Sequence, residues 1–243
     1  MTNLNTLSVE RLETMHNSGT RVLECYRILQ KLNFNVVGEL ISTADDFYEW
    51  DHYPDGDAYD HETHAQYYYH AHPPGDRTEV FGDENGHFHT FLRPKGMPKH
   101  IKPVPLPDYE DPEGDNDDLT HIIGISMNAA GYPVRLFTTN RWVTGEAWYT
   151  AENIIEILDV FDIDLPWPSW PTNIWVTHFL QLFQPTIVGL LKERDKVLAD
   201  WQVRHPGVNA YEDRDLEITS IKEISVENQI TAIGDALKKK KQA

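Results

Sequence analysis

Histidine is concentrated in one part of this sequence, at a spacing that could bind a metal. Eight of the twelve histidines lie between residues 52 and 100, and four of them form two His-x-His pairs, His70 with His72 and His87 with His89. Both pairs lie in segments with the composition of β-strands, in which alternate residues point to the same face. Each pair therefore places two imidazoles side by side, roughly 6.5–7 Å apart at the backbone. Imidazole is the commonest protein ligand for zinc, copper and non-haem iron, so the pattern predicts a metal site.

The two pairs could bind one ion if their strands are neighbours. Antiparallel pairing places facing side chains within about 5 Å at their β-carbons, so three or four imidazoles could reach one metal at about 2.0–2.1 Å. Three nearby side chains are further candidate ligands: His64, His121 and Glu79. We expect a divalent transition metal, and the ligand types do not decide among iron, zinc, copper and manganese. The alternative interpretation is a group of half-buried histidines that hydrogen-bond only to the many neighbouring tyrosines.

Side chains that could bind a substrate lie close to the predicted strands. Tyr68 shares a strand face with the first histidine pair, and Arg77, Arg93 and Arg135 flank the strands. Arginine binds carboxylates and phosphates, so these residues are candidates for holding a small organic ligand. The alternative role of the arginines is ion pairing with the abundant aspartates and glutamates.

One His-x-His pair on a strand is similar to the first motif of the cupins. In that motif a glutamate follows three or four residues after the second histidine, whereas this sequence has Gly75 and Asp76 there, and Glu79 comes too late. The chain also has fewer predicted strands than a double-stranded barrel needs, so the similarity is confined to the histidine pair.

The order of the predicted elements favours an α+β fold. Alternating apolar residues and turn signals predict strands over residues 66–72, 79–81, 87–92, 120–127 and 133–139, and residues 216–221 could add a short edge strand. Residues 45–60 contain the turn formers Pro54-Asp55-Gly56-Asp57 and are expected to form a loop. Because helices precede and follow this block of strands, we expect an antiparallel sheet of about four to five strands with helices packed on one side.

Helices are expected at both ends of the chain. Apolar residues at helical spacing predict helices over residues 8–32, 150–160, 172–204 and 225–241. Pro185 falls inside the third and should kink it or split it in two. Residues 165–191 carry no formal charge, and their polar content favours a core helix over a membrane span.

We expect one domain over residues 1–243, because neither half has enough elements to close a core. Residues 94–118 hold six prolines and an acidic cluster and are expected to form an acidic surface loop, and residues 238–243 a lysine-rich tail.

The formal net charge of −18 repels phosphate backbones, which argues against nucleic-acid binding. Cys25 is the only cysteine, which excludes an intrachain disulfide and a thiolate zinc site. With no signal-peptide pattern at the N-terminus, these features predict a cytoplasmic protein with no membrane partner.

The functional hypothesis is a histidine-rich metal-binding protein, extended to a non-haem metalloenzyme that acts on a small organic substrate. No Walker loop, GxGxxG, GxSxG or HExxH motif is present, so nucleotide-dependent and serine-hydrolase classes have no support. The alternative is a non-enzymatic acidic interaction or scaffold protein without metal. A third hypothesis is a small-ligand carrier that uses the arginines.

Overall fold

The computed structural model describes residues 4–73, 75, 78–82, 84–106, 109–110 and 112–242. Its centre is a six-stranded antiparallel sheet in which each strand pairs with the next one along the chain. The strands are β1 (Tyr53–Tyr59), β2 (Ala65–Ala71), β3 (Glu84–Leu92), β4 (Thr120–Asn128), β5 (Pro133–Thr139) and β6 (Ile218–Glu223). The predicted α+β class is confirmed, with one strand more than the upper number expected.

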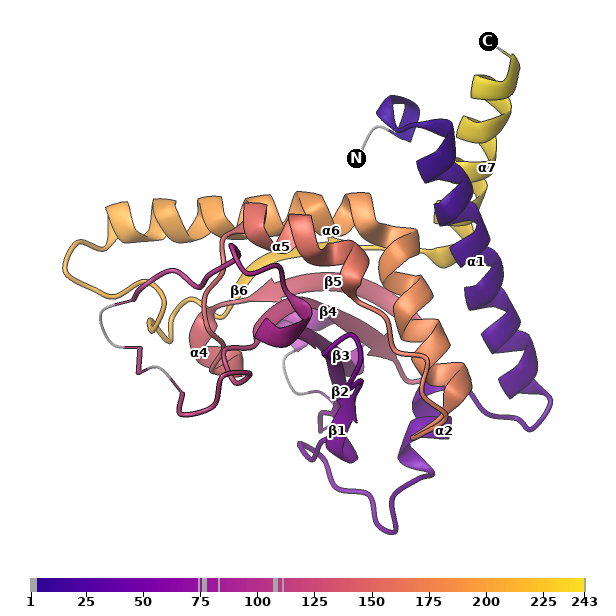
Figure 1. The fold of residues 1–243 in the computed structure, drawn as a ribbon. Coiled ribbons are helices and arrows are strands. Elements are labelled where there is room, and N and C mark those ends of the chain that lie inside the picture. The colour runs from indigo at the N-terminus through magenta and orange to yellow at the C-terminus, as the bar shows by residue number, and fades with distance from the viewer. Residues whose placement is uncertain are drawn as a thin grey trace.

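Seven α-helices accompany the sheet within the described ranges. They are α1 (Val9–Gln30), α2 (Val36–Ile41), α3 (Thr78–Phe81), α4 (Arg141–Thr144), α5 (Ala151–Ile157), α6 (Trp170–Arg204) and α7 (Val226–Gln242). Short 3-10 turns occupy Leu4–Thr6, Pro94–Gly96 and Leu158–Val160. Figure 1 shows α6 crossing one face of the sheet with α5 beside it, while α1 and α7 lie side by side at one end.

The face of the sheet that α6 covers carries the main apolar core. Tyr67 and Phe88 project toward this helix, where the Phe88 ring lies 5.6 Å from that of Trp175. The Tyr67 hydroxyl, fully buried, donates a hydrogen bond to Oδ1 of Asn173 at 2.6 Å. This bond ties the start of α6 to the second strand, because a buried hydroxyl needs a partner.

α6 is a single helix that bends (Figure 1), with Pro185 inside it, so of the two predicted outcomes the kink is the one observed. In the part of the chain that the structure describes, it is the one helix long and apolar enough to cross a membrane, and 72% of its most apolar window is buried inside the protein. A buried core helix passes the same test of length and composition, so the length of α6 is weak evidence for a membrane span.

The expected loop over residues 45–60 is wrong for its second half, which forms β1. Tyr53 pairs with Tyr69 and Ala58 with Tyr67, so the turn-forming residues between them bulge out of an edge strand. An edge strand accepts proline and a bulge because one side of its backbone needs no partner. The turn formers therefore mark an irregularity inside a strand rather than its absence.

One further expectation is corrected, and another is refined, near the ends of elements. Residues 79–81 lie in α3, a single helical turn, and not in a strand. The strand that follows β2 along the chain is therefore β3, and these two strands pair directly. The lysines of residues 238–241 lie in α7, as the predicted helix over residues 225–241 has them, and the lysine-rich tail expected over residues 238–243 is helical through Gln242. Lys241 pairs with Glu13 of α1 at 2.8 Å. Within residues 94–118 the described part is mostly without helix or strand, as expected of a surface connection.

Candidate metal centre

The second face of the sheet, opposite α6, carries the histidines. The register pairs His70 with His87 and Tyr68 with His89, so the two His-x-His pairs share one face of neighbouring strands, as their spacing predicts. His72 continues that row just beyond β2, where its backbone N–H donates to the carbonyl of Asn85 at 3.0 Å. His72 and His87 are buried, and His70 is half-buried.

Three imidazoles converge on one point. Among the described residues, His70, His72 and His87 are the one group of three or more whose possible ligand atoms all lie within 4.8 Å of one another. Nε2 of His70 lies 2.7 Å from Nε2 of His87. Two nitrogens bound at about 2.1 Å to one ion are roughly 3.0 Å apart at a right angle and 3.4 Å apart at a tetrahedral angle. To hold a metal, the pair would therefore open by about 0.3 Å for a right angle and about 0.7 Å for a tetrahedral angle.

Glu84 orients one of these imidazoles. Its carboxylate Oε1 accepts a hydrogen bond from Nδ1 of His87 at 2.8 Å, and its side chain is only 4% exposed. An acceptor on Nδ1 leaves Nε2 with a lone pair directed into the cluster, which is the usual arrangement around a metal-bound histidine. Strand alternation alone would place residues 84 and 87 on opposite faces, but a bulge between Glu84 and Gly86 brings them together.

His89 and His121 form a second, deeper pair. Nδ1 of His89 lies 3.0 Å from Nε2 of His121, and both side chains are buried. Burial lowers the pKa of His89 well below its usual value, and neighbouring imidazoles add to this effect. Burial, together with the charge of Arg194, lowers the pKa of His121 to about 3. Both rings are therefore neutral at physiological pH, which is the form that binds metals.

A second bulge places His121 on the histidine face. Thr90 pairs with Ile123 and Phe91 with His121, so β4 contains one residue more than β3 between these positions. Without that extra residue, His121 would share the α6 face with Ile123.

Small and aromatic residues close the cluster on its β5 side. The Phe137 ring lies over Gly124, where a β-carbon would overlap it, and its centroid is 5.0 Å from that of His87. Phe81 of α3 packs against both Phe137 and His87, at 5.0 and 6.0 Å between ring centroids. These rings bury the inner side of the cluster.

The outer side of the cluster is lined by two rings that the sequence analysis did not single out. Trp50 lies 4.4 Å from His72 and 6.0 Å from His70 between ring centroids, and it is half exposed. His52 stacks on Tyr68 at 3.5 Å and lies 6.2 Å from His70. Trp50 has a φ of 72°, a left-handed conformation that costs free energy in a non-glycine residue. Both rings therefore lie near the half-buried His70.

The other predicted site residues are distributed as follows. His64 hydrogen-bonds to the hydroxyl of Tyr59, away from the cluster, and Glu79 is exposed on α3. Tyr68 contacts the rings of both His70 and His89. Arg77 and Asp76 lie outside the described residues.

The two described candidate arginines bind protein groups. Arg93, just beyond the end of β3, donates to the side chain of Gln66 at 2.6 Å and pairs with Asp117 at 3.0 Å. Arg135 donates to the carbonyl of Phe81 and lies 3.5 Å from Glu223. These contacts fit the ion-pairing alternative and anchor α3 over the sheet.

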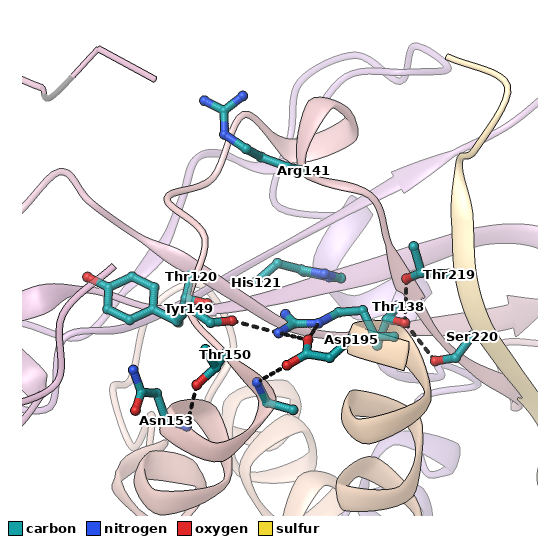
Figure 2. A network of polar contacts seen from close by, with 12 residues as sticks. Thr120, His121, Thr138, Arg141, Tyr149, Thr150, Asn153, Asp195, Thr219 and Ser220 are labelled. Atoms are coloured by element: carbon teal, nitrogen blue, oxygen red, sulfur yellow. Dashed lines mark hydrogen bonds and ion pairs between the residues drawn. The ribbon is translucent and has the colours of Figure 1, made fainter. Parts of the chain in front are cut away.

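A buried glutamate lies behind His121, and sequence reasoning missed it. Glu146 has no exposed surface, and its Oε2 accepts a hydrogen bond from the backbone N–H of His121 at 2.6 Å. Burial raises the pKa of Glu146 to about 7. Figure 2 shows His121 next to a polar network in which Asp195 accepts from the first backbone N–H of α5. Nothing in the spacing around residue 146 distinguishes this carboxylate from the many exposed ones.

The fold and this site together define an α+β protein with a six-stranded antiparallel meander that carries a buried histidine cluster on the face opposite its long helix. The chain belongs to the family described as a domain of unknown function, DUF6969, whose profile matches residues 16–224. That range contains every residue of the cluster. No curated protein and no solved structure matches the chain.

Proposed function

We propose that this protein binds a divalent transition metal through His70, His72 and His87. The observation that carries the proposal is the convergence of three possible ligand nitrogens within 4.8 Å: His70 and His87 face each other in the β2–β3 register, and His72 directly follows β2. The Glu84 carboxylate on Nδ1 of His87 supports it, because ligating histidines usually donate their second ring N–H to such a group. Three imidazoles leave coordination positions open, which is the pattern of catalytic rather than purely structural sites.

We propose further that the metal acts on a small organic substrate approaching from the side of His70. This ligand is the half-buried member of the three, and aromatic rings of Trp50, His52 and Tyr68 surround it. A cavity of about 500 Å³ lies at the segment that leads into and forms the start of β1; His52 is among its lining residues, whereas none of the three proposed ligands lines it. Its size suits a small organic molecule, and the metal would polarise a bound oxygen or activate water.

Elemental analysis of untagged protein tests the metal site. Protein stripped with a chelator is incubated separately with iron, zinc, copper and manganese, dialysed, and its metal content measured. We expect at least one ion per chain, and we expect His87→Ala to lose it. His100→Ala is the matched control, because His100 is exposed and lies outside the cluster. A ratio near zero with all four metals would reject the proposal and favour the interaction protein without metal.

A further inference from the structure

The His89–His121 pair repeats the arrangement of the His70–His87 pair. In each pair two ring nitrogens face each other at hydrogen-bond distance, 3.0 Å and 2.7 Å respectively. In each pair an oxygen lies within hydrogen-bond distance of Nδ1 of one ring. Glu84 Oε1 lies 2.8 Å from Nδ1 of His87, and Thr139 Oγ1 lies 3.4 Å from Nδ1 of His121. That contact leaves Nε2 of His121 as the nitrogen directed at His89. Two nitrogens bound at about 2.1 Å to one ion at a right angle lie about 3.0 Å apart. The two facing nitrogens of the His89–His121 pair already have this separation.

A buried hydroxyl on the same face provides a second observation. Ser126 pairs with His87 across β3 and β4, and its Oγ is buried with no hydrogen-bond partner among the residues that the structure describes. Buried polar atoms are nearly always hydrogen-bonded, so such an atom indicates a missing ligand or water. Ser126 lies on β4 next to the histidine rows, where it could accept or donate to a ligand between the two pairs.

The two pairs belong to one continuous cluster. The ring centroid of His89 is 4.7 Å from that of His87 and 5.5 Å from that of His70. Two ions held by the two pairs would therefore be neighbours, as in sites where two metals lie about 3.5–4 Å apart.

We propose that the cluster holds two transition-metal ions, the second bound by His89 and His121 with oxygen ligands from the neighbouring hydroxyls or water. This inference deepens the proposed function, since it rests on a first ion at His70, His72 and His87. It also gives His89 the role of a ligand to a separate ion rather than of a fourth ligand to the first.

Metal stoichiometry separates the two proposals. Chelator-stripped wild-type protein is titrated with Cu²⁺ and with Zn²⁺, bound metal is counted after dialysis, and the copper-loaded protein is examined by electron paramagnetic resonance. We expect two ions per chain in wild type, one in His121→Ala and two in the surface control His100→Ala. We also expect the second equivalent of copper to broaden the signal of the first, because neighbouring spins interact.

One ion per chain in wild type, with an unbroadened copper signal, would overturn the second site and leave the first in place. No bound ion would remove both proposals. Two ions in a folded His121→Ala variant would show that the second ion lies elsewhere. Should that variant fail to fold, the wild-type stoichiometry and its copper spectrum decide the question without it.

Discussion

Replacing Glu146 by glutamine should change how the stability of the protein depends on pH. Glu146 is fully buried, and it accepts hydrogen bonds from the backbone of His121 at 2.6 Å and from the Thr120 hydroxyl at 3.3 Å. Desolvation raises its pKa from 4.5 to about 7, outweighing the positive charge of Arg194 and the hydrogen bonds, which lower it. Glutamine keeps an oxygen acceptor at the same place and does not titrate.

The sign follows from the two pKa values of Glu146. The folded state binds the proton more tightly than the unfolded chain, so the associated stability is fully present below pH 4.5 and is lost as the pH rises through 7. At about 1.4 kcal/mol per pKa unit, the interval corresponds to a loss of about 3 kcal/mol for wild type. Glu146→Gln should avoid this loss, so the variant gains about 3 kcal/mol relative to wild type between pH 4 and pH 8.

Urea denaturation of metal-free protein at several pH values measures this difference. His121 has the opposite effect, because its lowered pKa makes stability fall as the pH drops from 6.5 toward 3, but it is present in both proteins and cancels. Glu193→Gln, on an exposed part of α6, is the control and should show no such trend. A difference between wild type and Glu146→Gln that stays constant over this pH range would refute the reasoning.

Three other substitutions test the packing and the proposed site. Tyr67→Phe leaves Oδ1 of Asn173 without its buried donor and should lower the free energy of unfolding by about 1–3 kcal/mol, measured by urea denaturation. Gly124→Ala places a methyl group against the Phe137 ring and should cost about 1–3 kcal/mol, measured as a lower melting temperature. Glu84→Gln should weaken metal affinity by about 10–100-fold in a calorimetric titration, with the number of bound ions unchanged.

Each of these has an outcome that would contradict it. Wild-type stability in Tyr67→Phe would mean that the Asn173 amide finds another donor. An unchanged melting temperature in Gly124→Ala would mean that the Phe137 ring moves aside at little cost. Equal metal affinity in Glu84→Gln and in the exposed control Glu79→Gln would remove the orienting role of Glu84.

Sequence periodicity predicted the regular parts of this fold. The strand over Pro133–Thr139 has the predicted bounds, and the shared face of the two His-x-His pairs follows from strand alternation. β1 was missed because proline, aspartate and glycine in its interior normally mark a turn, and only pairing with β2 shows that they bulge from an edge strand.

The parts of the site that sequence could not predict depend on irregularities of the sheet. Glu84 and His121 reach the histidine face through two bulges, and a bulge inverts the alternation from which faces are assigned. Trp50 and Glu146 come from segments without periodicity, so only the tertiary structure shows that they adjoin the cluster. His89 was expected to join the first three histidines, whereas the structure pairs it with His121.

All ligands of the first proposed ion, and the carboxylate that orients one of them, lie on a single β-hairpin between residues 70 and 87. Contacts between segments this close along the chain form early, because closing a short loop costs little entropy. A nascent chain could therefore acquire this ion as soon as the hairpin has left the ribosome, before α6 is made. The ion would then organise the hairpin on which the remaining strands assemble. A shortage of the metal would affect folding during synthesis as well as the finished protein.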